Sequence, residues 1–203
     1  MFSFNFVHRL LAVPILFFIA IHLLNHIVSI AGVESHIAFM DVFRGIYRNS
    51  YVEVALLFFL SVQISIGLYF VFRAKNKRQG FFAKAQALSG LYIAFFVFFH
   101  VGAVLHGRYN LGLDTNFYFA SAGMHINQLD LFFIPYYFFS VVAVFTHVAC
   151  FIHRRISNVS IDRANMAAGI VMILGGLVGT LIVAALGGVF YDINIPSEYK
   201  SMF

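Results

Sequence analysis

Residues 10–31 of the chain read LLAVPILFFIAIHLLNHIVSIA, an apolar run that holds two histidines, His22 and His26, one helical turn apart. The run has the roughly 20 residues that a helix needs to cross the hydrocarbon core of a bilayer. An ionisable side chain is costly inside a bilayer, so histidines in such a segment indicate a functional site. The stretch therefore predicts a membrane-spanning helix that carries a binding site.

The composition of the whole chain agrees with a membrane location. Hydrophobic residues make up 62% of the sequence and charged residues 10%, with a mean hydropathy of +0.89, which excludes an ordinary soluble domain. The single cysteine, Cys150, excludes an internal disulfide and a cysteine-rich metal site. The first apolar run is too long for a signal peptide and has no Ala-x-Ala cleavage site, so we expect it to be retained.

Five segments are long and apolar enough to span a membrane. They are expected at about residues 7–31, 51–73, 86–106, 131–153 and 166–190. The sequence therefore predicts an all-α fold, an integral membrane bundle of five transmembrane helices. We expect residues 1–203 to form a single transmembrane domain, with the longer connections, 32–50 and 107–130, on the outer side.

Basic residues are concentrated on one side of the predicted spans. That side holds nine of the thirteen lysines and arginines: Arg9, Arg73, Lys75, Lys77, Arg78, Lys84, Arg154, Arg155 and Arg163. The opposite side holds seven of the eight acidic residues, all but Asp162. The positive-inside rule therefore predicts an inner N-terminus and an outer C-terminus. We expect the membrane to be the inner, cytoplasmic membrane of a bacterium.

The fifth segment is rich in glycine, and Gly175 and Gly179 have the GxxxG spacing of close helix packing. This smooth face predicts close packing inside one bundle. A contact between two copies of the chain, which would make a homo-oligomer, is the alternative.

Two histidines on different spans are expected at the same depth. With a rise of 1.5 Å per residue, His22 lies roughly 22 Å and His100 roughly 21 Å from the inner ends of their spans. Two neutral imidazoles at one depth can ligate a haem iron from both faces, so we favour this pair as the ligands of a haem b. His26 and His106 form a second matched pair at roughly 30 Å, and His26 is kept as an alternative ligand or propionate partner.

A second haem would need a second pair of histidines on the inner half. His147 lies there in the fourth span, but the second span offers Gln63, and glutamine is a poor haem ligand. His147 is therefore interpreted as a packed core residue, a single haem ligand or part of a quinone site. His36 and His125 are expected in the outer loops.

Three arginines are expected on the outer side of the bundle, near the predicted haem. Arg44, Arg48 and Arg108 lie in the outer connections, where their planar guanidinium groups could bind the haem propionates. Snorkelling and pairing with the outer carboxylates is an equally weighted alternative.

One pattern has three parts. They are His8-Arg9-Leu10-Leu11-Ala12, the first-span histidine, and Ser89-Gly90 before the third-span histidine. The pattern, with five spans, resembles the membrane-anchor cytochrome b subunits of succinate dehydrogenase and fumarate reductase in their single-subunit, two-haem form. The resemblance implies that His22 and His100 ligate the outer haem. For the inner haem the resemblance implies one ligand on the fourth span, which is His147, and one on the second span, where this chain has Gln63 in place of a histidine.

A second pattern runs from His8-Arg9 through Arg44-x-x-Tyr47-Arg48-x-x-x-x-Glu53 and Gln86-x-x-Ser89-Gly90 to His100. It is similar to the transmembrane domain of the fungal mitochondrial adapter family that recruits a bridge-like lipid-transfer protein. This resemblance covers about residues 5–155 and leaves out the fifth span. It implies a cytochrome b bundle used as an adapter or in lipid handling.

The leading hypothesis is a b-type cytochrome that passes electrons between a quinone and a partner. The chain has no flavin motif, nucleotide loop or cysteine cluster, so substrate oxidation would need a soluble flavoprotein or iron–sulfur subunit, and no nucleic acid is expected as a partner. We expect haem retention to be lost in His22→Ala and His100→Ala but kept in His36→Ala.

The alternatives are a non-enzymatic adapter or lipid-handling protein and an outer metal site. The metal site would use His26, His36, His106 and His125 with Glu34 or Asp130.

Overall fold

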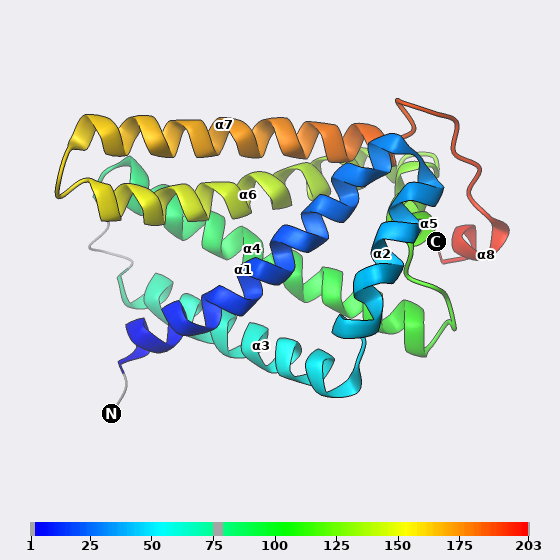
Figure 1. Cartoon of the computed structure of the whole chain (residues 1–203), viewed down its shortest axis with the longest axis horizontal. Coiled ribbons are helices and arrows are strands. Elements are labelled where there is room, and N and C mark those ends of the chain that lie inside the picture. Colours follow the sequence, from blue (N-terminus) through cyan, green and yellow to red (C-terminus); the bar gives the residue numbers. More distant parts are fainter. Residues whose placement is uncertain (1–2, 75–78, 203) are drawn as a thin grey trace. The chain divides into compact units, whose positions relative to one another are not determined.

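The computed structural model describes residues 3–74 and 79–202, and within these ranges all regular secondary structure is helical (Figure 1). Five of the described helices are long and apolar enough to cross a membrane. They are α1 (Phe4–Val28, continued to Ala31 by a 3₁₀ turn), α3 (Ser50–Arg73), α4 (Phe81–Tyr109), α6 (Asp130–Ile156) and α7 (Ile161–Leu186). The predicted all-α membrane fold with five spans is confirmed. Lys75, Lys77 and Arg78 of the basic connection lie outside the described residues.

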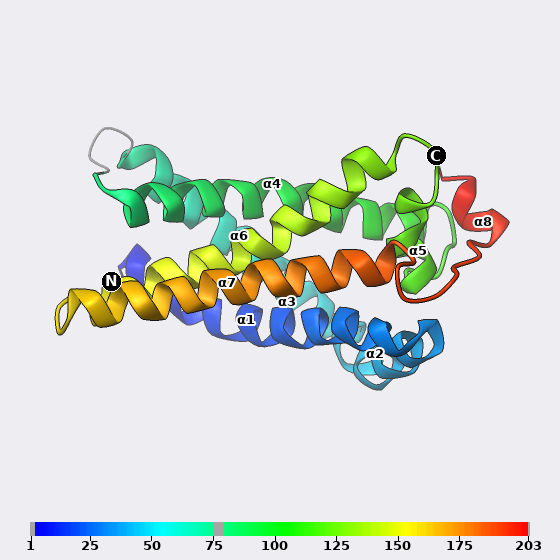
Figure 2. The same ribbon diagram turned by 90° about the horizontal axis from the view of Figure 1, so that it is seen from above.

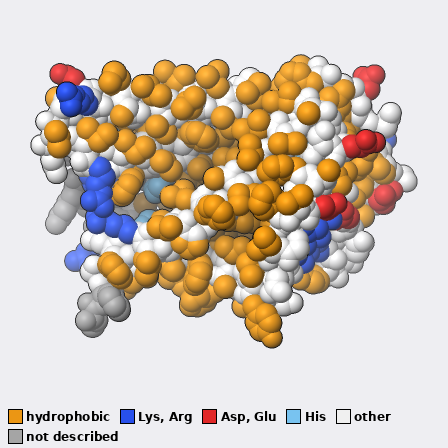
Figure 3. Space-filling model, viewed as in Figure 1, with side chains coloured by type: hydrophobic (Ala, Val, Ile, Leu, Met, Phe, Trp, Pro, Cys, Tyr) orange, Lys and Arg blue, Asp and Glu red, His pale blue; other side chains and the backbone are white. Residues whose placement is uncertain are grey.

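The surface of these helices suits a lipid environment. Large apolar side chains point outward, such as Phe17 on α1, Phe98 on α4 and Ile173 on α7, which are 66 to 74% exposed. Figure 3 shows hydrophobic side chains spread over the face in view. Such a surface would aggregate in water and is stabilised by lipid, so the chain is an integral membrane protein. The direction in which the helices cross the membrane stays a prediction.

The chain divides into two compact units, Met1–Lys75 and Asn76–Phe203. Whether the two form the single transmembrane domain expected from the sequence stays a prediction, and each unit is described by itself.

The first unit contains α1, α2 (Val33–Tyr47) and α3. Polar side chains define where its spans begin: Ser3 accepts a hydrogen bond from the Phe6 amide at the start of α1, and Asn49 accepts one from the Tyr51 amide at the start of α3. The connection expected between the first two spans is itself a helix, since α2 leads from the end of α1 to the start of α3 (Figures 1 and 2).

The second unit is built on α4, α6 and α7. Helices α4 and α6 are antiparallel, because the Phe82 ring stacks on His153 near one end and the Phe96 ring packs on Tyr136 towards the other. Helices α6 and α7 lie side by side in both views (Figures 1 and 2). The short helices α5 (Phe117–Ser121) and α8 (Ser197–Lys200) complete the unit.

The glycine-rich face of α7 packs on α6. A Cβ atom on Gly175 would lie 2.4 Å from Phe145 Cβ, and one on Gly179 would lie 3.2 Å from the Phe138 ring. Both glycines are buried, so the GxxxG pair serves packing inside the second unit. A homo-oligomer through the remaining face of α7 stays a prediction.

Helix α7 ends at Leu186, four residues before the predicted end of the fifth span. The reason is Gly188, whose φ of +79° ends the helix in a Schellman motif in which the Val189 amide donates to the Ala184 carbonyl. The Leu186 carbonyl also accepts hydrogen bonds from Ser121 Oγ at 2.6 Å and His125 Nε2 at 2.9 Å. His125, expected in an outer loop, therefore has a structural role at the end of α7.

Candidate functional site

The two histidines of α1 share one face of the helix, as their spacing predicted. The centroids of the His22 and His26 rings are 4.8 Å apart and the rings are nearly perpendicular. One turn earlier, the Phe18 ring lies parallel to His22 at 5.8 Å. The structure thus brings the favoured ligand His22 and its alternative His26 into contact, next to an aromatic wall.

A third imidazole joins this pair from α2. His36 is 2% exposed and its ring centroid lies 5.3 Å from that of His26. Asn25 Nδ2 donates to His36 Nε2 at 3.0 Å, so the hydrogen-bond pattern assigns the proton of the neutral ring to Nδ1. His36 was expected in an outer loop, and its burial was not predicted from the sequence. The signal was the spacing of His36, Met40 and Phe43, which share one helical face.

The environment of His36 opposes its protonation. Burial, with smaller contributions from the nearby His22 and Arg44, lowers the pKa of His36 from 6.5 to about 4. His26 and Asn25 also face the ring. Because the folded state favours the neutral ring, this contribution to stability is complete above pH 6.5 and is lost as the pH falls from 6.5 towards 4.

We therefore expect the free energy of unfolding to fall by about 2 kcal/mol between about pH 7 and about pH 5 because of His36 alone. The measurement is the stability of the detergent-purified protein at both pH values, compared with His36→Gln, which keeps an acceptor for Asn25 but does not titrate. Equal pH dependence in the two proteins would contradict the prediction.

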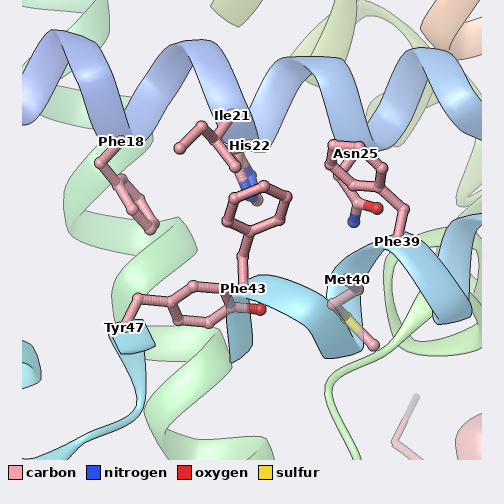
Figure 4. A pocket seen from close by; sticks show the side chains of 8 residues that line it. All are labelled: Phe18, Ile21, His22, Asn25, Phe39, Met40, Phe43 and Tyr47. Atoms are coloured by element: carbon pink, nitrogen blue, oxygen red, sulfur yellow. The ribbon is translucent and has the colours of Figure 1, made fainter. Parts of the chain in front are cut away.

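A pocket lies between α1 and α2 (Figure 4). Its lining combines aromatic and polar side chains: Phe18, Ile21, His22, Asn25, Phe39, Met40, Phe43 and Tyr47. Asn25 Oδ1 is buried and has no hydrogen-bond partner among the described residues. The cavity volume is about 20 Å³, which is room for about one water molecule.

Two of the three arginines predicted to bind propionates, Arg44 and Arg48, lie at the end of α2. Arg44 pairs with Asp41 at 3.3 Å, and its Nη2 lies 3.4 Å from Met40 Sδ. Arg48 forms the C-cap of α2. Since Met40 lines the pocket, Arg44 lies close to the His22 site.

In the second unit, His100 is half-buried on α4. Its ring stacks on Phe96 at 5.0 Å with an interplanar angle of 14°. His106 is exposed, and the guanidinium of Arg108 lies over the Tyr109 ring at 5.0 Å. These three predicted site residues lie on one helix, α4.

His147 is held by the motif that carries the resemblance. Ser89 Oγ donates to the Gln86 carbonyl and lies 3.2 Å from His147 Nδ1. Because the hydroxyl has one hydrogen, Ser89 accepts from Nδ1–H, and Nε2 of His147 carries the lone pair. Gly90 makes room for the ring, since a Cβ there would lie 3.3 Å from Cε1. Ser89 and Gly90 thus fix the position and orientation of the His147 ring.

Gln63, which stands where the resemblance predicts a histidine, contacts a histidine of α1. Its Nε2 donates to His8 Nδ1 at 3.4 Å within the first unit. The amide that stands where the resemblance predicts a histidine thus binds a histidine of α1, and its Oε1 is buried without a hydrogen-bond partner among the described residues.

The predicted metal site on the outer side finds no support in the described part of the chain. No group of three or more His, Cys, Asp or Glu side chains there could hold a metal ion. His26 and His36 are in contact, but His125 donates to the end of α7 instead.

The residues around His22 fit a haem in their chemistry. Haem b needs imidazole for its iron, apolar walls for the porphyrin and cations for its propionates. Here they are His22, the rings of Phe18, Phe43 and Tyr47, and Arg44. The cavity between α1 and α2 is far smaller than a porphyrin, so a haem would need room beyond this helix pair. Comparisons of the chain with protein-family models, with curated proteins and with solved structures gave no match.

Proposed function

We propose that the chain is a membrane-embedded b-type cytochrome, in which His22 and His100 hold the iron of one haem b. The observation that carries the proposal is the surroundings of His22: an imidazole in an apolar span, parallel to Phe18, with Tyr47 and Arg44 on the neighbouring α2. The neutral form of an imidazole is the one that binds iron.

The helix geometry is consistent with this pair. Both α1 and α4 are continuous through their histidines. His22 lies about 27 Å from the start of α1 and His100 about 28 Å from the start of α4, by the rise per residue. Under the predicted topology both helices begin on the inner side, which is why we expect the two imidazoles at one depth.

When bound, the haem supplies one-electron exchange at its iron. The chain's own residues bind and orient it: the histidines ligate, the aromatic rings exclude water and Arg44 pairs with a propionate. We propose a quinone as one electron partner and a soluble flavoprotein or iron–sulfur subunit as the other, in a bacterial inner membrane. His147, oriented by Ser89, is the proposed ligand if a second haem is bound.

A non-enzymatic adapter or lipid-handling role is the second candidate. Two observations favour it: the small cavity beside His22, and the bond of Gln63 to His8 where the resemblance predicts a histidine. In that case the bundle has kept its fold without the haem.

The deciding measurement is the visible spectrum of the detergent-purified protein, oxidised and after reduction with dithionite, with haem quantified per chain. We expect a sharp low-spin b-type spectrum and about one haem per chain. About two haems would assign a ligand role to His147. A protein without haem, even after expression with a haem precursor, would contradict the cytochrome and favour the adapter.

A further inference from the structure

In the second unit the ring of His100 packs on Phe96, and Phe96 in turn packs on Tyr136. The Phe96 ring is nearly parallel to His100, with centroids 5.0 Å apart. On α6, the Tyr136 ring packs on Phe96 at 4.7 Å and 38°. Phe96 therefore contacts both the imidazole on its own helix and Tyr136 on α6.

The Tyr136 hydroxyl reaches the backbone of the same turn. It donates to the Phe96 carbonyl at 3.2 Å. In an α-helix this carbonyl also accepts the amide of the residue four positions later, which is His100. The turn that carries His100 is thus hydrogen-bonded to a side chain of the neighbouring helix.

Tyr136 is itself well fixed. Its side chain is 8% exposed and its ring stacks on Phe132 at 5.2 Å and 19°. Its carbonyl accepts the Tyr92 hydroxyl at 3.1 Å, so a second hydrogen bond joins α4 to α6. Because Tyr136 has a fixed position, it can fix the group that it binds.

We propose that Tyr136 is a positioning residue for His100: its hydroxyl anchors the Phe96–His100 turn and thereby sets the plane of the imidazole, which stacks on Phe96. The role concerns this chain's own residues, and its relevance to a haem rests on the proposed function. The imidazole plane matters there because outer groups that orient a ligand tune the metal.

The test compares Tyr136→Phe with Tyr92→Phe. Both variants remove one hydroxyl that donates across α4 and α6 to a backbone carbonyl, but only the first donates to the His100 turn. Labelling carbonyl carbons of Phe and amide nitrogens of Val gives signals only from Phe–Val pairs, which occur at 6–7, 70–71 and 96–97. The solid-state NMR signal of the Phe96 carbonyl reports its hydrogen bonding without any haem.

In Tyr136→Phe we expect the Phe96 carbonyl signal to shift upfield, while the other two pairs do not move. In Tyr92→Phe we expect none of the three to shift. Where haem is bound, Tyr136→Phe should keep its haem content but shift the highest g value of the oxidised haem in electron paramagnetic resonance.

The outcomes separate the two proposals. An unchanged Phe96 carbonyl in Tyr136→Phe, or an equal shift in Tyr92→Phe, would overturn the positioning role even if haem is bound. An unchanged g value in haem-loaded Tyr136→Phe would overturn its effect on the imidazole plane. A wild-type protein without haem would overturn the cytochrome, while the expected carbonyl shift would still support the anchored turn.

Discussion

His22→Ala and His100→Ala are each expected to lose essentially all bound haem, because each removes one of the two proposed ligands of the iron. Haem content per chain and the low-spin spectrum of the purified variants measure this effect. His26→Ala and His106→Ala test the alternative ligand pair, His26 with His106. We expect both variants to keep haem. Full haem retention in both His22→Ala and His100→Ala would refute the proposed ligands.

The control for this series has to be chosen with care. His36→Ala, expected from the sequence to be neutral, would remove a buried ring and leave the Asn25 amide without its acceptor. Haem loss in that variant would therefore not identify a ligand. His153→Gln is a better control, since the glutamine amide can still bond the Asn165 side chain that His153 contacts at 3.1 Å.

Gly175→Ala is expected to destabilise the protein by about 1–3 kcal/mol, because the new methyl group would lie 2.4 Å from Phe145 Cβ. A Cβ atom cannot rotate away, so α6 and α7 would have to separate. The measurement is the loss of helicity or of a folded fraction on heating or in denaturing detergent.

The neighbouring glycine provides the matched control. A Cβ on Gly176 would meet nothing within 4 Å, so Gly176→Ala should be neutral or stabilise by up to about 1 kcal/mol through helix propensity. Equal changes in stability in Gly175→Ala and Gly176→Ala would contradict the close contact of α6 and α7 at Gly175.

The five spans could be predicted from the sequence because the bilayer imposes one strong rule: about 20 apolar residues with all backbone groups satisfied inside the helix. The exact ends are set by weaker local effects. The fifth helix ends at Leu186 rather than at residue 190 because Gly188 adopts a positive φ. The number of apolar residues in a segment does not predict such a backbone conformation.

The candidate site was predictable only in part. The shared face of His22 and His26 follows from helix periodicity alone. The burial of His36 and the bond between Gln63 and His8 depend on how α2 and α3 pack on α1, and hydropathy carries no information about such contacts. The pairing of His22 with His100 stays a prediction, since it rests on depth and resemblance.

The contact between Gly90 and His147 links two positions 57 residues apart in the chain. A side chain at 90 would press on the imidazole, and a smaller residue at 147 would leave Ser89 without the N–H that it accepts and a void beside the glycine. Both changes would disturb the contact between the two residues, so each position limits what the other can hold. Where a related chain has lost the histidine, we expect the glycine to be free to change as well.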